Sequence, residues 1–174
     1  FYNFKSYMLM HGVSKVVDNA NFGVDAARAS WGVYDHIVFK RMLHDFDTEK
    51  TPFFSTIFTL INHEPFNLPD GYKFGTKTNA DKFRSTAFYT DSVVYDFINQ
   101  AKSKSWYKNT LFVVVADHGH RLPAEKWELS NPHRFHIPLL FFGDVIKPEF
   151  RGKKIEIIGN QTDIVATLLH QLNL

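Results

Sequence analysis

The chain has 174 residues, of which 44% are hydrophobic and 16% aromatic, and its formal net charge is +2. This length and apolar content suffice for one globular domain with a hydrophobic core. The absence of cysteine excludes disulfide bonds and cysteine-ligated metals. The small charge comes from scattered Lys and Arg residues, so it gives no reason to expect nucleic-acid binding.

Helical and strand patterns alternate along the chain. In chain order we predict a helix at 34–45, a strand at 54–61, a loop at 64–79, a helix at 79–104, a strand at 111–116, a loop at 119–135, a strand at 137–142 and a helix at 163–172 with Thr162 as its N-cap. The strands are short and rich in Val, Ile, Leu or Phe, which is typical of strands covered on both faces. The pattern predicts an α/β layered fold, with a mostly parallel sheet flanked by helices.

The long helix at 79–104 has apolar residues at helical spacing. They are Phe83, Ala87, Phe88, Tyr95 and Ile98. Asp91 falls on the same predicted face, so we expect a buried carboxylate with an Arg or backbone N–H partner.

Polar residues follow two of the predicted strands. The strand at 111–116 runs directly into Asp117 and His118, and the strand at 54–61 leads to His63. In parallel α/β sheets, ligands gather outside the carboxyl ends of the strands. A carboxylate oxygen and an imidazole nitrogen together suit Mn²⁺, Zn²⁺ or a similar divalent ion. The pattern indicates a metal site at the sheet edge.

A plainer interpretation of Asp117-His118-Gly119 is a turn in which the aspartate caps a following helix. In the metal interpretation, Gly119 lets the chain turn away at once, even at positive φ. We interpret Trp31 as a core aromatic, and the alternative is that it lines the ligand cleft. Further histidines are interpreted as surface or satisfied core residues: His11, His36, His44, His120 and His170.

Several sequence blocks occur together in the order found in one family. They are "SWGVYDHIVF", "TLINHEPF", "FYTDSVVYDFI", "YKNTLFVVVADHG", "HIPLLFFG" and "QTDIVATLLHQL". This ordered set resembles the carboxyl-terminal half of a sulfatase of the alkaline phosphatase superfamily. Within that superfamily it is most similar to the lipoteichoic-acid-synthase-like (phosphoglycerol transferase) branch. The resemblance implies an alkaline-phosphatase-like layered fold, of which this chain is a part.

The resemblance also implies roles for particular residues. Asp117 and His118 match the pair that holds a divalent metal, with Mn²⁺ expected first and Zn²⁺, Mg²⁺ or Ca²⁺ as alternatives. His63 matches the histidine that contacts the phosphate or sulfate of the substrate. His133 and His136 are further candidates for catalytic contacts to that oxyanion. The expected function is a metal-dependent, sulfatase-like enzyme that cleaves or transfers a sulfate or phosphate ester.

Part of the family's site has no match in this sequence. The early acidic ligand and the nucleophile of the family lie upstream, so we interpret residues 1–174 as the C-terminal part of a catalytic domain. The isolated chain is expected to be inactive. Lipoteichoic-acid synthases also carry a Trp and an Arg that clamp glycerophosphate, and the aligned residues here are Tyr2 and Phe4. Phenylalanine cannot form the paired hydrogen bonds to phosphate that arginine forms, so glycerophosphate polymerisation is not expected.

The expected partner is a sulfate- or phosphate-ester substrate, with lipid- and glycan-linked esters among the candidates, and not nucleic acid. By resemblance, the parent protein is membrane-anchored, and its catalytic domain lies on the extracytoplasmic face of the bacterial cell membrane. The alternative function is a non-catalytic α/β binding module or an inactive fragment.

Overall fold

The computed structural model describes residues 3–124 and 126–174. Its helices are α1 (Phe4–Met10), α2 (Asp35–Thr48), α3 (Asn79–Ala101) and α4 (Thr162–Leu172), and its strands are β1 (Arg28–Ala29), β2 (Gly32–Val33), β3 (Phe112–Val115) and β4 (Leu139–Phe142). Short 3₁₀ helices lie at Asn19–Asn21, Tyr107–Asn109, Pro132–Phe135 and Pro148–Phe150. The predicted helices all form, and their ends shift by at most three residues. The N-cap of α4 is Gln161, so the prediction of Thr162 at that position was wrong. No helix in these described residues is both long and apolar enough to cross a membrane.

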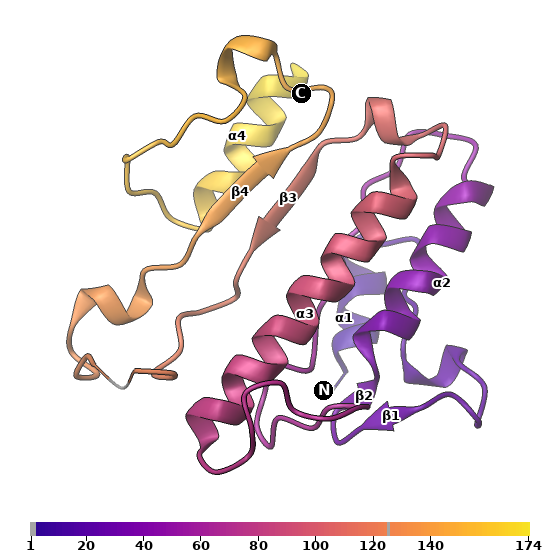
Figure 1. Ribbon diagram of the computed structural model, residues 1–174. Coiled ribbons are helices and arrows are strands. Elements are labelled where there is room, and N and C mark those ends of the chain that lie inside the picture. The colour runs from indigo at the N-terminus through magenta and orange to yellow at the C-terminus, as the bar shows by residue number, and fades with distance from the viewer. Residues whose placement is uncertain (1–2, 125) are drawn as a thin grey trace.

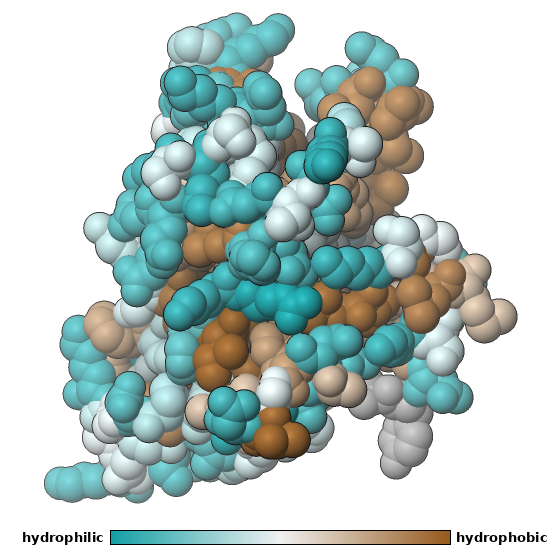
Figure 2. All heavy atoms as spheres, turned by 90° about the vertical axis from the view of Figure 1, so that its right-hand side faces the viewer, coloured by the Kyte–Doolittle hydropathy of each residue, from teal (hydrophilic) through white to brown (hydrophobic). Residues whose placement is uncertain are grey.

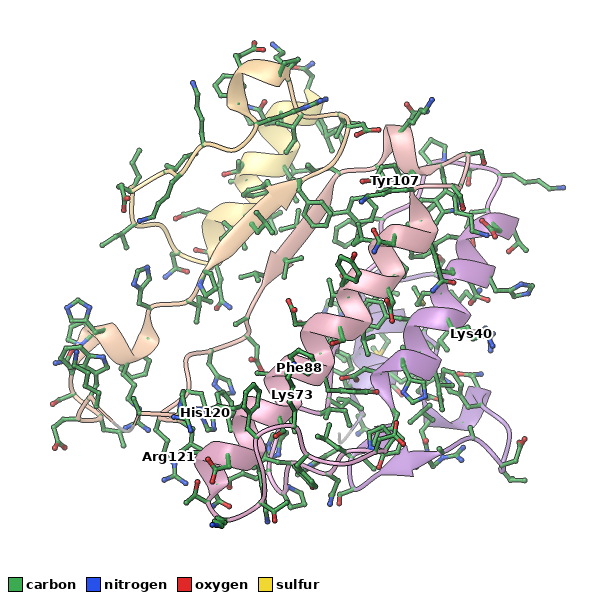
Figure 3. The ribbon with its side chains drawn as sticks, in the orientation of Figure 1. Lys40, Lys73, Phe88, Tyr107, His120 and Arg121 are labelled. Atoms are coloured by element: carbon green, nitrogen blue, oxygen red, sulfur yellow. The ribbon has the colours of Figure 1, made fainter. Side chains whose placement is uncertain are left out.

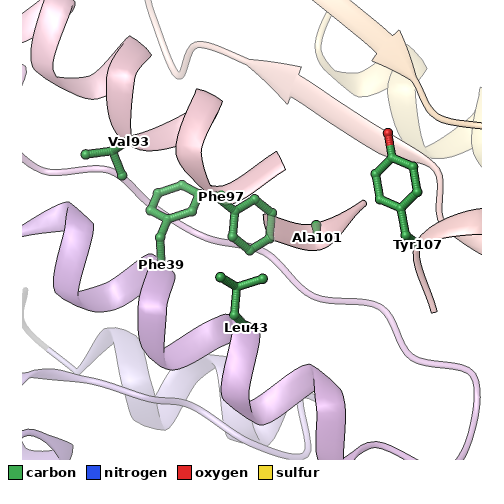
Figure 4. Packing of buried hydrophobic residues seen from close by; sticks show 6 residues of the cluster. All are labelled: Phe39, Leu43, Val93, Phe97, Ala101 and Tyr107. Carbon is green, nitrogen blue, oxygen red and sulfur yellow. The ribbon is translucent and has the colours of Figure 1, made fainter. Parts of the chain in front are cut away.

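The hydrophobic core lies between α2 and α3, which run side by side in Figure 1. Its buried residues are Phe39, Leu43, Val93, Phe97, Ala101 and Tyr107, drawn in Figure 4. Phe39 and Phe97 meet edge to face, with ring centroids 5.1 Å apart. A capping box at Thr78 and Asp81 fixes the start of α3, because each side chain bonds the backbone N–H of the other residue.

The buried face of α3 differs from the predicted one. Ser85, Thr86, Val93, Phe97 and Ala101 are buried, whereas the predicted-face residues Phe88 and Tyr95 are 43% and 66% exposed. Asp91 is also exposed, so its prediction as a buried carboxylate was wrong. The apolar pattern was misleading because small polar residues occupy part of the buried face. The hydroxyls of Ser85 and Thr86 donate to the carbonyls of Asp81 and Phe83, which satisfies them without another helix.

The α/β class is confirmed, but the mostly parallel sheet does not form within the described residues. Both of their ladders are two-stranded and antiparallel. β3 pairs with β4 from Phe112↔Phe142 to Val115↔Leu139. A parallel pair would need a crossover back to the starting end of the sheet. In the structure β4 instead returns beside β3 and runs in the opposite direction (Figure 1).

The segment predicted as a buried strand at 54–61 forms no strand and belongs to neither ladder. Phe54 is 86% exposed and Phe58 is 59% exposed. Apolar side chains are also exposed on the β3–β4 sheet and along α4: Val114, Val115, Leu139, Leu140, Val165 and Leu172. Figure 2 shows brown, hydrophobic side chains between hydrophilic ones on another face, the one that lies to the right in Figure 1. Exposed apolar surface of this extent is typical of surfaces that contact another segment or partner.

Candidate metal and oxyanion site

Asp117 and His118 lie just beyond the end of β3, and their side chains are 81% and 67% exposed. The Oδ2 atom of Asp117 is 3.6 Å from Nε2 of His118. Two ligand atoms that each lie about 2.1 Å from one ion are roughly 3.0–3.6 Å apart at ordinary coordination angles. The pair therefore has the spacing of two neighbouring ligands on one divalent ion.

The protonation of the His118 ring suits a metal ligand. Its Nδ1 lies 2.8 Å from the carbonyl oxygen of Gly119. A carbonyl can only accept, so Nδ1 carries the proton and donates it. In the neutral ring, Nε2 then keeps the lone pair that binds a metal. A backbone carbonyl that fixes the tautomer in this way is a common feature of metal-ligating histidines.

The pair does not form a complete metal site by itself. Within residues 3–124 and 126–174, no three His, Asp or Glu side chains gather closely enough to hold an ion. A divalent ion in a protein takes at least four ligands, including water. The donor chemistry of Asp117 and His118 fits such an ion, and they would supply two of its ligands.

His63 lies in a loop that is held by Trp31. The indole Nε1 of Trp31 donates to the carbonyl of Glu64 at 2.6 Å, and Nδ1 of His63 donates to the same oxygen at 2.7 Å. The Trp31 and His63 rings meet with centroids 4.4 Å apart. Trp31 is 47% exposed, so its prediction as a core aromatic was wrong. The shared carbonyl occupies Nδ1 of His63, so a further contact of this ring would use Nε2.

Asp35, the first residue of α2, holds the chain just before His63. Its carboxylate accepts the backbone N–H groups of Leu60 at 2.9 Å and Ile61 at 3.4 Å, and the residue is 1% exposed. In a strand at 54–61, these N–H groups would donate to a neighbouring strand. In the structure they donate to the Asp35 carboxylate instead. Burial raises the pKa of the Asp35 carboxyl, and the two backbone donors oppose this shift.

Replacing Asp35 with alanine is expected to destabilise the fold by about 2–3 kcal/mol, because two backbone N–H groups lose their buried acceptor. Urea unfolding of the full-length protein measures the effect. The matched control is Asp91→Ala, since Asp91 is exposed on α3, and its effect should stay within about 0.5 kcal/mol. Equal midpoints for the two variants would contradict this role of Asp35.

The raised pKa of Asp35 also predicts a pH dependence. The folded state binds the proton more tightly than the unfolded state, whose pKa is near 3.8. The contribution of this carboxyl to stability is therefore greatest below that value and declines as the pH rises through the folded-state pKa. We expect the stability advantage of wild type over Asp35→Asn to be smaller at roughly pH 7 than at roughly pH 4. Urea unfolding at both pH values tests the sign, and a larger advantage at the higher pH would refute it.

The His63 loop and the loop after His118 are connected to each other. Arg121 donates to Oε1 of Glu64 at 3.3 Å. The His120 ring stacks on Phe83 of α3 with centroids 4.7 Å apart, and it meets Phe66 edge to face at 6.2 Å. Figure 3 shows His120 and Arg121 beside the first turns of α3. These contacts bring the two predicted halves of the site to the same end of α3.

His120 itself serves a structural purpose. Its Nδ1 accepts the backbone N–H of Leu122 at 3.0 Å, and burial lowers the pKa of its ring. Both effects favour a neutral imidazole packed between aromatic rings. His120 is nonetheless exposed, so of the two interpretations, surface or satisfied core residue, the surface one is confirmed.

The segment with His133 and His136 lies against Gly119, the residue that follows the candidate metal pair. A Cβ atom at Gly119 would lie 1.9 Å from the carbonyl oxygen of Arg134, so the two segments are in close contact. Gly119 does not have positive φ, which corrects that expectation. Glycine is required here for space and not for its backbone conformation. The His133 ring stacks on Trp127 with centroids 5.0 Å apart, and His136 is exposed.

The site residues thus come from β3 and from loops that α2 and α3 support. Sequence reasoning missed the Glu64–Arg121 ion pair and the role of Trp31. It also missed Gln161, whose side-chain amide donates to the carbonyls of Ala116 and Asp117. Gln161 opens the "QTDIVATLLHQL" block, and that was the one signal for it.

Comparison with solved structures defines the class of the protein. The chain superposes on a protein in the alkaline phosphatase superfamily from Vibrio parahaemolyticus with a TM-score of 0.80 and 28% sequence identity. The match covers 99% of this chain and 42% of that one. An alkaline-phosphatase-superfamily fold is thereby confirmed for these residues.

Sequence comparison gives the family. The Sulfatase family model matches residues 2–174, so the chain belongs to the Sulfatase family, which is a family of enzymes. It is 29% identical to the lipoteichoic acid synthases of Staphylococcus aureus strains USA300 and NCTC 8325, over 98% of this chain. The chain spans 28% of the length of these relatives. Members of the superfamily generally use divalent metals.

Proposed function

We propose that this chain is the later part of a catalytic domain that uses a divalent metal, Mn²⁺ in the first place, to cleave or transfer a sulfate or phosphate ester. The observation that carries the proposal is the Asp117–His118 pair. Its ligand atoms are 3.6 Å apart, and the carbonyl of Gly119 keeps Nε2 of His118 free for metal binding. Zn²⁺, Mg²⁺ and Ca²⁺ are the alternative ions.

When bound, the metal ion supplies positive charge that screens the negative charge of the ester oxygens. Asp117 and His118 would hold that ion at the end of β3. His63 binds a non-bridging oxygen through Nε2, because Glu64 and Trp31 occupy and orient the other side of its ring. In its charged form this ring donates a hydrogen bond to the oxyanion, which favours a transition state with growing negative charge. His133 and His136 are further candidates for such contacts.

The nucleophile and the remaining metal ligands are proposed to come from a preceding part of the same domain. The exposed apolar side chains on the 54–61 segment, the β3–β4 sheet and α4 support this, because together they offer a surface for another part of the domain to cover. The lengths of the relatives agree with it, since the chain spans 42% of the matched Vibrio protein.

The surroundings of Phe4 favour a substrate other than a glycerophosphate polymer. Phe4 packs edge to face on Phe58, with centroids 5.8 Å apart, and it has no group that could clamp a phosphate. Tyr2, the other residue of that comparison, lies outside the described residues. We propose hydrolysis of the ester, or its transfer to another acceptor. Lipid- and glycan-linked esters are the candidate substrates. By similarity to lipoteichoic acid synthase, we place a membrane-anchored parent protein on the extracytoplasmic face of the bacterial cell membrane.

The proposal is tested on the full-length protein after chelator treatment and reloading with Mn²⁺, Zn²⁺, Mg²⁺ or Ca²⁺. Turnover of p-nitrophenyl phosphate and p-nitrophenyl sulfate then separates the ester classes. We expect metal-dependent release of p-nitrophenol from at least one of them. Binding of ester or glycan without turnover under every metal would favour the rival function, a non-catalytic binding module.

The role of His63 is tested by His63→Ala, which is expected to lower kcat/KM about 100-fold, since one positioned donor to the reacting oxyanion is lost. His44→Ala is the matched control because His44 is an exposed histidine on α2. If kcat/KM were unchanged in His63→Ala, the catalytic role of His63 would be refuted, whether or not the enzyme depends on a metal.

A further inference from the structure

Gln161 joins the start of α4 to the end of β3. Its Nε2 atom lies 2.7 Å from the carbonyl oxygen of Ala116 and 2.9 Å from that of Asp117. A side-chain amide has two N–H donors, so one can go to each carbonyl. These two carbonyls lie on either side of the Cα atom of Asp117, which carries the carboxylate of the metal pair. They come 45 and 44 residues before Gln161 in the sequence.

These bonds matter because the β-ladder has already ended. The last paired residues of the sheet are Val115 and Leu139. Asp117 therefore lies beyond the main-chain hydrogen bonds that hold β3 in place. Gln161 supplies hydrogen bonds to the next two residues, Ala116 and Asp117, and the second of these is the first residue of the metal pair.

Gln161 is itself held by a hydrogen-bonded turn. The Oδ1 atom of Asn160 accepts the backbone N–H of Thr162 at 3.1 Å and its hydroxyl at 3.1 Å. Oδ2 of Asp163 accepts the backbone N–H of Asn160 at 2.7 Å. Side-chain bonds to the backbone on both sides restrict the turn that carries Gln161. The backbone around Gln161 is therefore held on both sides, although the residue itself is exposed.

We propose that Gln161 is a positioning residue for the metal pair. By fixing the carbonyls of Ala116 and Asp117, it sets the direction in which the Asp117 carboxylate and the neighbouring His118 ring leave the strand. In this role it acts through the backbone of Asp117 and not through a contact of its own with the metal or the substrate. This inference rests on the proposed function, because it assigns Gln161 a role in metal binding at that same site.

The test measures Mn²⁺ affinity of the metal-free, full-length protein by titration calorimetry. Gln161→Met keeps the length of the side chain and removes both donors. The matched control is Gln171→Met, because Gln171 is exposed on the same helix, α4. We expect Gln161→Met to bind Mn²⁺ about 10-fold more weakly, the lower end of the range for residues that orient metal ligands. Gln171→Met should bind Mn²⁺ as wild type does.

Two further measurements separate positioning from a purely structural role. Thermal unfolding of the metal-free variants reports stability, and the absorption spectrum of Co²⁺-loaded protein reports the geometry of the ligands. We expect an altered Co²⁺ spectrum in Gln161→Met with little change in its melting temperature. Wild-type Mn²⁺ affinity in this variant, with or without a lower melting temperature, would overturn the inference. So would an equal loss of affinity in Gln171→Met.

The same titration distinguishes failure of this inference from failure of the proposed function. Asp117→Ala should lose Mn²⁺ binding whether or not Gln161 matters. If Asp117→Ala binds Mn²⁺ as tightly as wild type, both the metal-site assignment and the role of Gln161 are refuted. If only Gln161→Met matches wild type, the metal site stands and Gln161 has no part in it.

Discussion

Replacing Asp117 with alanine is expected to weaken Mn²⁺ binding by about 100-fold or more and to abolish metal-dependent turnover. Residues that merely orient a ligand cost about 10- to 100-fold in affinity when they are lost, so loss of a ligand should cost at least as much. The structure places the Asp117 carboxylate 3.6 Å from Nε2 of His118, where both can reach one ion. Titration calorimetry on the full-length, metal-free protein measures the change.

The control for this experiment is Asp96→Ala, since Asp96 is an exposed aspartate on α3. Asp117 is itself largely exposed, so its replacement should leave the metal-free fold near wild-type stability. A loss of metal binding in Asp117→Ala can then be assigned to the ligand and not to unfolding. Wild-type affinity and turnover in this variant would refute the metal-site assignment.

Gly119→Ala is expected to lower both the stability of the fold and the affinity for the metal ion. The added methyl group would lie 1.9 Å from the backbone carbonyl oxygen of Arg134. A backbone atom cannot swing aside as a flexible side chain does, so one of the two segments must move. We expect a loss of about 1–3 kcal/mol in unfolding free energy, as for other overpacked sites. Because Gly119 follows His118 directly and accepts its Nδ1–H, Mn²⁺ affinity should fall as well.

Gly71→Ala is the matched control for the glycine experiment. No atom lies within 4 Å of a Cβ built at Gly71, and its φ is not in the left-handed region. This substitution should therefore leave stability unchanged or raise it slightly. Urea unfolding of both variants makes the comparison. If Gly119→Ala unfolded at the same urea concentration as Gly71→Ala, the close contact with Arg134 would not matter for folding.

Local patterns in the sequence were enough to predict the helices at α2, α3 and α4 and the strands β3 and β4. Amphipathic spacing and short β-branched runs depend on neighbours within a few residues, so they can be recognised without the fold. The Asp117-His118 sequence at a strand end indicated metal chemistry for the same reason. The reason for glycine at position 119 could not be predicted in this way. It is the close approach of the Arg134 backbone, which exists only in the folded chain.

The sequence by itself determined where α2, α3, α4, β3 and β4 lie, and it placed a carboxylate and an imidazole at the end of β3. Only the tertiary structure decided that β3 pairs antiparallel with β4, that Asp35 replaces a ladder for Leu60 and Ile61, and that Gln161 anchors Asp117. The physical reason is distance along the chain. Backbone geometry and side-chain periodicity act locally, whereas these contacts join residues that are tens of positions apart and form only when the whole chain packs.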